Sequence, residues 1–399
     1  MNTVDDYNRL GEELAARGIN IDEVKARLKK QKLETPSWAY GDGGTRFYVF
    51  KQEAAARTVW EKIADAAEVH KYTGITPTVA LHIPWDWVEN WEELADYARE
   101  LGVAVGSINP NLFQDPDYKL GSVTNVDPKV RRKAIDHMLE CVEIMKRTGS
   151  KVLSMWLADG TNYPGQGDFR RRKRWMEEAY REVYEALDDD MVILIEYKMF
   201  EPAFYHTDLA DWGMATDLAR KLGPKAKTLV DLGHHASGTN IEHIVAYLID
   251  EGKLGGFHFN SKKYADDDLT SGSINPYELF LIYNELAKAE ADPDNAPEIA
   301  YMIDQSHNIK PKIQAMIQSV QNLQTAYAKA LLVNQEKLTE LQAAGDVVGA
   351  EEVLMTAFNT DVTPLLKAVR RELGVPENPL EAFRQSGYEA KVAKERSGR

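Results

Sequence analysis

The chain is poor in cysteine, with Cys141 as the only one among its 399 residues. A single thiol cannot close a disulfide within the chain, which excludes the small secreted domains that depend on disulfide frameworks. A reducing compartment fits this count best, so we expect a cytoplasmic protein. A structural zinc site built from several cysteine ligands is disfavoured for the same reason.

The sequence also lacks long apolar runs. None approaches the roughly 18 residues that a membrane-spanning helix requires. The first residues, MNTVDDYNRLGEELAARG, are acidic and amphipathic and contain no basic segment followed by an apolar core. We therefore expect neither a signal peptide nor a membrane partner.

Positive charge is scarce relative to negative charge. The chain has 48 lysines and arginines against 63 aspartates and glutamates, which gives a net charge of −15. This charge repels nucleic acids at long range and makes a DNA- or RNA-binding role unfavourable. It suits a protein that gathers cations.

Strand-like and helix-like patterns alternate through most of the sequence. Clear strands are expected at Thr78–Ile83, near Val103, Val152 and Val192, and at Thr228–Leu232, Gly255–Phe259 and Ala300–Asp304, with a weaker eighth strand at Ser37–Tyr40. Helical periodicity fills the intervals, which is typical of parallel βαβ units. The pattern predicts an α/β fold, a (β/α)8 TIM barrel spanning 35–310, with a doubly wound open sheet as the alternative.

Helical segments without strands flank the predicted barrel. Residues 1–34 are expected to form an N-terminal helical arm, and 311–399 a C-terminal helical extension that ends in the polar, frayed tail EAKVAKERSGR. The extension has apolar helical faces but no core of its own. It would pack on the barrel or on a second subunit, and we favour the second subunit and thus a role in oligomerisation.

Four apolar runs end on residues that bind divalent metals: Glu196 in LIEYK, Asp231 in LVDLGHH, His258 in GFHFN and Asp304 in YMIDQSH. Parallel strands of a barrel place their carboxyl ends at one rim, so these side chains should meet there. Acidic residues at strand ends can also be helix N-caps, but a histidine in the same position is not explained in this way. The carboxylate and imidazole ligands fit Mn²⁺, Mg²⁺ or Co²⁺.

Three further candidate ligands lie close by in the sequence: His234, Asp266 and Asp268. Seven ligands are too many for one ion. The simplest division assigns Glu196, Asp231, His258 and Asp304 to one metal and the other three to a second metal, with Asp231 as the bridging carboxylate.

Other side chains at the same rim could bind a substrate. Lys198 lies two residues after Glu196 and shares its face of the strand, where it could polarise a substrate oxygen or balance the carboxylates. His82 ends a strand and could act as a general acid or base, or be a core histidine. Several tryptophans follow strand ends and favour a carbohydrate pocket, although core packing is the simpler explanation for any one of them: Trp38, Trp85, Trp87 and Trp156.

The motifs IEYK, VDLGHHASGTNIE, FHFNSKKYADDDL and MIDQSHN, preceded by PSWAYGDGGTRF and LHIPWDW, resemble those of the L-rhamnose isomerases. The resemblance spans about 35–310. It implies a xylose-isomerase-like barrel that binds two divalent ions, usually Mn²⁺ with Co²⁺, Mg²⁺ or Zn²⁺ as alternatives, and isomerises L-rhamnose to L-rhamnulose. It further implies a homotetramer and a tolerance for related aldoses.

The resemblance also implies roles for individual residues. The metal that grips the substrate oxygens would be held by Glu196, Asp231, His258 and Asp304, and the catalytic metal by His234, Asp266 and Asp268. Lys198 would lie near the substrate carbonyl, and His82 would bind the sugar or open its ring; Asp304 would be the third catalytic residue. The remaining pocket residues would be Trp38, Trp156, Ser306 and Phe47, the last reaching into the site of a neighbouring subunit.

Three other functions were weighed against this one. A sugar 3-epimerase on the same barrel needs one metal and two carboxylate bases, so the spare ligands count against it. An endonuclease of this fold should have a basic face, which the charge of −15 opposes. A non-catalytic metal-binding protein is the third. For the isomerase, the sequence leaves open whether hydrogen moves between C1 and C2 as a hydride or through a cis-enediol.

Overall fold

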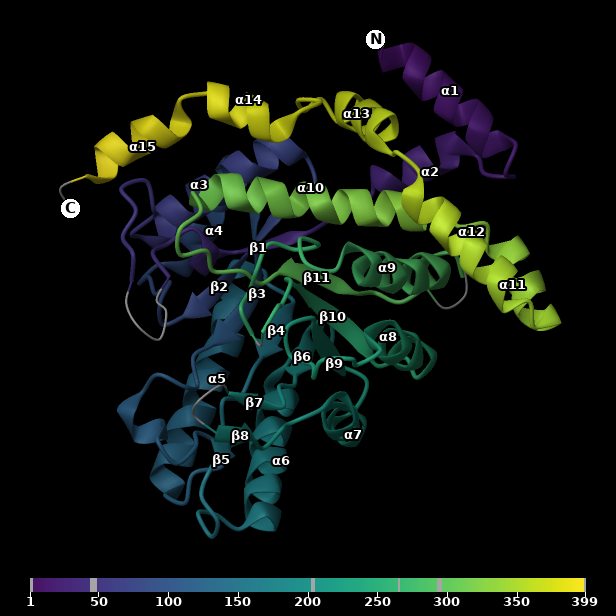
Figure 1. Cartoon of the computed structure of the whole chain (residues 1–399). Helices are drawn as coiled ribbons and strands as arrows, with labels where there is room; N and C mark the ends of the chain where they lie inside the picture. Colours follow the sequence, from purple (N-terminus) through teal and green to yellow (C-terminus); the bar gives the residue numbers. More distant parts are fainter. Residues whose placement is uncertain (1–2, 44–48, 202–204, 265, 293–295, 398–399) are drawn as a thin grey trace.

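The computed structural model describes 3–43, 49–201, 205–264, 266–292 and 296–397. Its centre is a closed barrel of parallel strands in the order β1-β11-β10-β9-β6-β4-β3-β2, so neighbours along the chain are neighbours in space except where the chain leaves the barrel. Helices surround the strands (Figure 1). The predicted (β/α)8 barrel is confirmed, and the open sheet is excluded.

The barrel strands are short and mostly apolar. Runs such as TVALHI and VILIE are buried along nearly their whole length, as expected for parallel strands that are covered on both faces. Their bounds are β1 Glu34–Pro36, β2 Thr78–Ile83, β3 Ala104–Pro110, β4 Val152–Met155, β6 Val192–Glu196, β9 Ala226–Asp231, β10 Leu254–Phe259 and β11 Ala300–Ile303.

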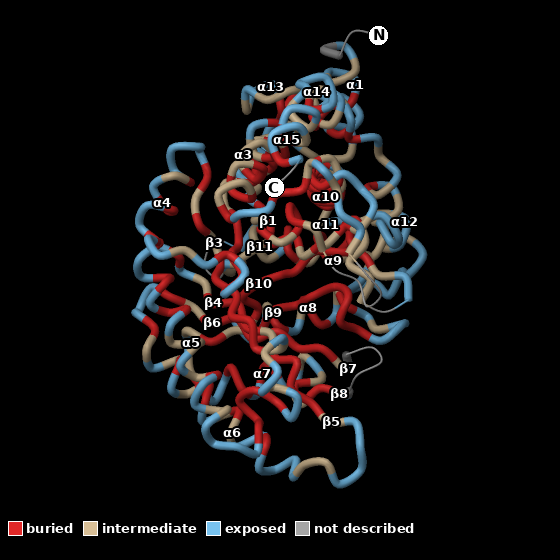
Figure 2. The backbone as a smooth tube through the Cα atoms, turned by 90° about the vertical axis from the view of Figure 1, so that its left-hand side faces the viewer, coloured by how far each residue is buried: buried red, intermediate tan, exposed pale blue. Residues whose placement is uncertain are grey.

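One helix follows each barrel strand. Most of these helices begin at an asparagine or aspartate whose side chain accepts a hydrogen bond from the first turn, for example Asp127, Asp211 and Asn240. The barrel helices are α3 Val59–Thr73, α4 Trp91–Glu100, α5 Pro128–Thr148, α6 Phe169–Ala186, α7 Trp212–Leu222, α8 Ile241–Asp250, α9 Pro276–Glu290 and α10 Lys312–Ala330. Figure 2 shows the buried strands at the centre and the exposed outer faces of the helices around them.

The first strand lies earlier than predicted. It is Glu34–Pro36, and Ser37–Ala39, expected to be strand, form a short 3-10 helix. Glu34, the last residue of the predicted arm, therefore belongs to the barrel. The shift places Trp38 beyond the strand end, on the rim where the candidate ligands gather.

The C-terminal extension begins with the eighth barrel helix. The predicted boundary at 310 falls just before α10, which packs against α9 and α3 and closes the ring of helices. The segments beyond it are α11 Gln335–Ala344, α12 Val347–Asn359, α13 Thr363–Glu372, α14 Pro379–Gln385 and α15 Tyr388–Arg396, while the arm consists of α1 Thr3–Ala15 and α2 Ile21–Leu28. Helices α13 and α14 lie along α10, and α1 lies beside α13 (Figure 1).

The polar tail is helical as far as Arg396, and for this part the prediction that it frays is wrong. Arg396 in α15 is only 3% exposed and binds Asp65 of α3 through two nitrogens, at 2.8 and 2.9 Å. It also donates to the carbonyl of Ala54 at 2.6 Å, and the Tyr388 hydroxyl donates to Asp65 at 2.9 Å. A charged end that looks solvated in the sequence is thus anchored by one buried ion pair.

A small second sheet, which the sequence analysis did not predict, extends the rim. Its antiparallel strands are β5 Gly160–Thr161, β8 Tyr205–Thr207 and β7 Phe200–Glu201, in that order. A short 3-10 helix, Pro116–Tyr118, lies in the loop after β3. Within the described ranges, no helix is both long and apolar enough to cross a membrane.

Replacing Arg396 with alanine should destabilise the protein by about 3–5 kcal/mol, because it leaves Asp65 as a buried charge without its main partner. Urea unfolding would measure the loss. Trypsin should also cleave the tail of Arg396→Ala at its lysines under conditions that leave the wild-type tail intact.

The matched control is Lys394→Ala in the same helix, whose side chain is exposed. It should change the free energy of unfolding by less than about 0.5 kcal/mol. A wild-type tail cleaved as quickly as that of Arg396→Ala would contradict the anchoring role.

Candidate metal centre

The barrel brings four predicted ligands together at its carboxyl end. Glu196 ends β6, Asp231 ends β9, His258 lies in register with Asp231 on β10, and Asp304 follows β11. One ligand atom from each lies within 4.8 Å of the others. Side chains far apart in sequence therefore form one compact group, which we call the first ligand group.

His258 lies at the centre of the first ligand group. Its Nδ1 lies 3.2 Å from Glu196 Oε1, 3.6 Å from Asp231 Oδ2 and 3.5 Å from Asp304 Oδ2. A single nitrogen facing three carboxylates is the arrangement expected where a cation would be shared among them. Asp304 is also held from outside, because Trp38 Nε1 donates to its Oδ1 at 2.9 Å.

A second ligand group adjoins the first and consists of Asp231, His234 and Asp266, again within 4.8 Å of one another. His234 Nε2 lies 3.3 Å from Asp266 Oδ1 and 3.9 Å from Asp231 Oδ1. Its other nitrogen, Nδ1, faces the carbonyl of Tyr197 at 3.0 Å, which orients the ring. Asp231 is common to both groups, as a bridging carboxylate must be.

Asp268 lines the same cavity but belongs to neither group. Its backbone has a φ of 45°, in the left-handed region that aspartate tolerates better than most residues. Burial, together with the charges of Asp266 and Asp304, raises the pKa of Asp268 well above its usual value. Its carboxylate thus faces other carboxylates and gains stability from any nearby cation.

The two histidines respond to the same crowding of negative charge. Burial lowers the pKa of His234, but Asp231 and Asp266 outweigh that effect and raise it to about 9. Burial likewise opposes protonation of His258, yet Glu196 and Asp231 raise its pKa well above the usual value. For Asp304, burial raises the pKa to about 6, against the opposing charge of His258. Without metal, His234 and His258 therefore hold protons on the nitrogens that would bind metal.

The donor set fits divalent cations of the hard and borderline classes. Both groups combine carboxylate oxygens with one imidazole, and neither contains a sulfur ligand. Such ligands suit Mn²⁺, Mg²⁺ or Co²⁺. The close approach of the carboxylates, which Lys198 and the protonated histidines compensate in part, is itself consistent with a site made for cations.

Lys198 joins the ligands to the rest of the cavity. It is 5% exposed, and its Nζ lies 2.6 Å from Asp266 Oδ2 and 5.1 Å from the centre of the Trp156 ring. Its ammonium therefore both fixes a ligand of the second group and faces the cavity.

The two groups open into a cavity of about 780 Å³ with an aromatic wall. Its aromatic rings are Trp38, His82, Trp85, Phe113 and Trp156. The His82 ring stacks on Trp85 at 3.9 Å, and Phe113 lies 5.0 Å from Trp156. This volume is ample for a monosaccharide, whose C–H faces stack on such rings.

Trp87 is an exception among the predicted pocket tryptophans. It does not line the cavity; it is 48% exposed and packs edge-on against Trp91 at 5.6 Å. The sequence placed it near the rim, but the turn after β2 directs Trp85 inward and Trp87 outward. Phe113 takes the place expected of a fourth aromatic residue.

His82 is a neutral, buried imidazole. Burial, and then the charge of Lys62, lowers the pKa of His82 to about 3. Its Nδ1 is buried without a hydrogen-bond partner among the described residues. Behind it, Asp86 accepts from the His82 backbone N–H at 2.8 Å and binds Lys62 at 2.6 Å, which fixes the turn.

The remaining predicted residues divide into two cases. Ser306 lines the cavity, and its hydroxyl lies against Gly43, where an added Cβ would force that hydroxyl to turn away. Phe47 lies outside the described residues.

Several cavity residues were missed by the sequence analysis, chiefly Asn109, Phe113, Gln114 and Lys62. Asn109 is the penultimate residue of β3 and the segment NLFQ follows this strand, so their position at the end of a barrel strand was the available signal. Lys62 lies on α3, and no sequence pattern distinguishes it from a solvated lysine.

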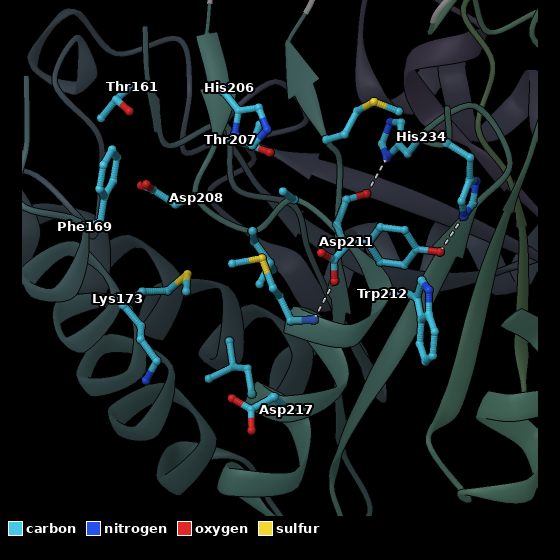
Figure 3. A pocket seen from close by; sticks show the side chains of 18 of the residues that line it. Thr161, Phe169, Lys173, His206, Thr207, Asp208, Asp211, Trp212, Asp217 and His234 are labelled. Atoms are coloured by element: carbon cyan, nitrogen blue, oxygen red, sulfur yellow. Dashed lines mark hydrogen bonds between the residues drawn. The ribbon is translucent and has the colours of Figure 1, made fainter. Parts of the chain in front are cut away.

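A larger cavity of about 1030 Å³ lies behind the metal-ligand groups, between α6, α7 and the small sheet (Figure 3). It shares His234 with the aromatic cavity, but much of its lining is apolar, including Trp212 and Phe169. The Tyr197 hydroxyl bonds to His235 Nε2 at 2.6 Å on its wall. Neither ligand group faces it apart from His234, so we assign the chemistry to the smaller cavity.

Comparison with known proteins identifies the family. The model of the family described as xylose isomerase-like TIM barrel matches 63–281. A probable sugar isomerase of Rhizobium meliloti (strain 1021) is 48% identical over 98% of this chain and 92% of its own length. A xylose isomerase of Thermus thermophilus is 27% identical over 47% of this chain and 50% of its own.

Solved structures support the fold alone. A 3-keto-D-glucoside 4-epimerase from E. coli and an L-ribulose 3-epimerase each superpose with a TM-score of 0.53 at 15% identity. The former covers 74% of this chain and 100% of its own, the latter 76% and 98%. The family match over more than half of the sequence and the near full-length relative together show that this chain belongs to the xylose isomerase-like TIM barrel family.

Proposed function

We propose that the protein is a metal-dependent sugar isomerase that interconverts an aldose and a ketose, with L-rhamnose and L-rhamnulose as its preferred pair. The observation that carries the proposal is the sharing of Asp231 between two ligand groups that open into one aromatic cavity. The relative from Rhizobium meliloti, itself a probable sugar isomerase, supports the reaction class. The choice of sugar rests on the motifs that resemble L-rhamnose isomerases.

Two divalent ions, Mn²⁺ in the first instance, would be held by the seven proposed ligands. Glu196, Asp231, His258 and Asp304 would hold one ion, and His234, Asp266 and Asp268 the other, with Asp231 bridging. Such ions, when bound, stabilise negative charge that develops on the sugar oxygens at C1 and C2.

The chain's own residues would supply binding and proton chemistry. His82 is neutral, and its Nδ1 has no partner among the described residues. It is therefore suited to form a hydrogen bond with the ring oxygen or an adjacent hydroxyl as the ring opens. Lys198, held by Asp266, would present its ammonium to the carbonyl oxygen of the open chain. Trp38 would keep Asp304 in place through its indole N–H.

The aromatic wall would exclude water from the reacting carbons. Trp38, Trp85, Phe113 and Trp156 line the cavity together with the carboxylates. Low water access favours a hydride shift between C1 and C2 over proton transfer through a cis-enediol, because the hydride shift needs neither a base nor water to carry the hydrogen. The buried Nε1 of Trp156, without a partner among the described residues, would donate to a sugar hydroxyl.

A homotetramer remains part of the proposal, as does the insertion of Phe47 into a neighbouring subunit's site. Both rest on the resemblance, because the structure is of one chain and Phe47 lies outside its described residues. The helices α11 to α15 would be available for subunit contacts beyond α10.

The metal-loaded protein should convert L-rhamnose to its ketose with the highest kcat/KM in a panel of aldoses. L-Mannose and L-lyxose share its configuration at C2 and C3 and should follow within about a hundredfold, since an apolar wall discriminates weakly against an added hydroxyl. D-Allose should react more slowly still, and L-fucose, with altered ring hydroxyls, poorly. Assaying ketose after incubation with Mn²⁺ gives the order.

The control for this panel is the same protein in excess EDTA, which should be inactive until Mn²⁺ or Co²⁺ is restored. Full turnover in EDTA would refute metal dependence. Formation of an epimeric ketose from a ketose substrate, with no aldose conversion, would indicate an epimerase. A higher kcat/KM for L-fucose than for L-mannose would refute the proposal that the sugar is recognised through its oxygens near the metals.

Metal binding should release protons at pH 7, and Mn²⁺ affinity should rise as the pH increases from 7 to 9. The pKa of His234 is about 9 without metal, so at pH 7 this imidazole is protonated and Mn²⁺ must displace its proton. Each displaced proton changes the affinity by up to about tenfold per pH unit below that pKa. Calorimetric titrations in two buffers of different ionisation enthalpy would count the protons. Identical heats in both buffers would contradict the prediction.

Asp268→Asn should weaken the second metal selectively. The pKa of Asp268 is raised because its carboxylate is buried among other carboxylates, so it gains most from a nearby cation. We expect kcat to collapse while thermal stability and the first metal are retained, as measured by metal analysis and thermal unfolding.

The neighbouring Asp267→Asn is the matched control. It makes the same change in charge, but the Asp267 carboxylate accepts from the backbone of Lys263 and Tyr264 instead of facing the cavity. Its metal content should be that of the wild type. Two ions per chain and near-normal activity in Asp268→Asn would refute its role as a ligand.

A further inference from the structure

Asn260, which follows β10 and is 2% exposed, contacts the shared carboxylate directly. Its Nδ2 lies 3.0 Å from Asp231 Oδ1 and 3.1 Å from Asp231 Oδ2. Because an ionised carboxylate only accepts hydrogen bonds, the amide must present its nitrogen and not its oxygen to Asp231. One donor group thus contacts both oxygens of this carboxylate.

The two oxygens of Asp231 face different ligand groups. Oδ2 lies 3.6 Å from His258 Nδ1, the central nitrogen of the first group. Oδ1 lies 3.9 Å from His234 Nε2, in the second group. The rotation of the Asp231 carboxylate about its Cβ–Cγ bond therefore decides whether each of the two ligand groups has one of its oxygens facing it.

The backbone holds only one of these oxygens. The N–H of Gly233 donates to Asp231 Oδ1 at 2.6 Å. A side chain at position 233 would not fit, since a Cβ there would lie 2.8 Å from Asp266 Oδ1 and 3.1 Å from Asp231 Oδ1. Oδ2 receives its hydrogen bond from Asn260, so Asn260 completes the restraint that Gly233 begins.

The oxygen of the Asn260 amide makes no hydrogen bond within the described part of the chain that would fix the orientation of this side chain. Asn260 Oδ1 is buried and has no hydrogen-bond partner among the described residues. A buried acceptor without a partner is destabilising, and the amide retains this orientation although its oxygen gains no bond. The hydrogen bonds to Asp231 are thus what determines the rotamer.

We propose that Asn260 is a positioning residue that fixes Asp231 as the bridge, directing one carboxylate oxygen to each metal. This role rests on the proposed two-metal function. It predicts that without the Asn260 amide nitrogen the carboxylate turns about its Cβ–Cγ bond, and the coupling between the two sites is lost before either site is abolished.

The test uses Asn260→Asp, which keeps the shape and removes the donor, and Asn260→Leu, which removes all polarity. Electron paramagnetic resonance of the full-length protein titrated with Mn²⁺ reports both affinity and exchange coupling between two bridged ions. We expect a coupled spectrum for the wild type and spectra of separate ions for both variants. The Mn²⁺ affinity should fall by about 10- to 100-fold, the usual effect of losing an outer hydrogen bond to a ligand.

Asn284→Leu is the matched control. Asn284 is also buried, at 4% exposure, but lies on α9 and bonds to Gln335, away from the ligand groups. It should retain the coupled spectrum whatever its effect on thermal stability. Coupling lost in the Asn260 variants but kept in Asn284→Leu would separate a positioning role from a general loss of stability.

The outcomes also separate this inference from the function on which it rests. A wild type that binds two Mn²⁺ with a coupled spectrum, and Asn260 variants with the same affinity and coupling, would overturn the role of Asn260 and leave the two-metal function standing. A wild type that binds one ion or none would overturn the two-metal function and with it the bridge.

Discussion

Electrostatic repulsion among carboxylates is the constraint on which the rest of the site depends. The barrel gathers Glu196, Asp231, Asp266, Asp268 and Asp304 at one end, where burial makes every charge more costly. Two histidines with raised pKa values and Lys198 supply positive charge, and the protons on the histidines are ones that a divalent cation can displace. Such an arrangement is unstable unless the scaffold holds it rigidly. The closed barrel provides that rigidity for the first ligand group, because Glu196, Asp231 and His258 lie at the ends of strands that are hydrogen-bonded on both sides and Asp304 directly follows another.

Within a strand, the residues that stabilise the barrel come first and the candidate ligands come at the carboxyl end. In β9 and β10 the residues before the last one or two are buried and mostly apolar, and the ligands come at the ends. The hydrophobic interior is therefore independent of the metal ligands, and the ligands need only short loops to reach one another. This explains why Gly233 matters locally, since the loop after β9 must pass within contact distance of Asp266 and Asp231.

The same separation explains what the sequence could predict. The barrel strands are short apolar runs that end on or just before a polar residue, so the barrel and the strand-end residues could be located from sequence. The structure brings Glu196, Asp231, His258 and Asp304 together. Partners across the fold have no such pattern. Arg396 looks solvated in the sequence but pairs with Asp65, and Trp87 looks like a pocket residue but faces outward. Asn260, two residues after the candidate ligand His258, showed no signal in the sequence because its contact with Asp231 depends on strand register.

The cavity therefore has two unlike halves, and they restrict a substrate differently. On one side, oxygens of a sugar would have to meet ligands whose positions are set by Asn260, Gly233, Trp38 and Lys198. A misplaced hydroxyl there leaves buried polar groups unpaired, at about 1–3 kcal/mol each. On the other side, aromatic faces offer contact with little directional demand, and a hydroxyl added to a methyl group changes the free energy only modestly. In the proposed isomerase the rigid half would consequently restrict the configuration at C2 and C3, whereas the aromatic half would select the far end of the sugar only weakly.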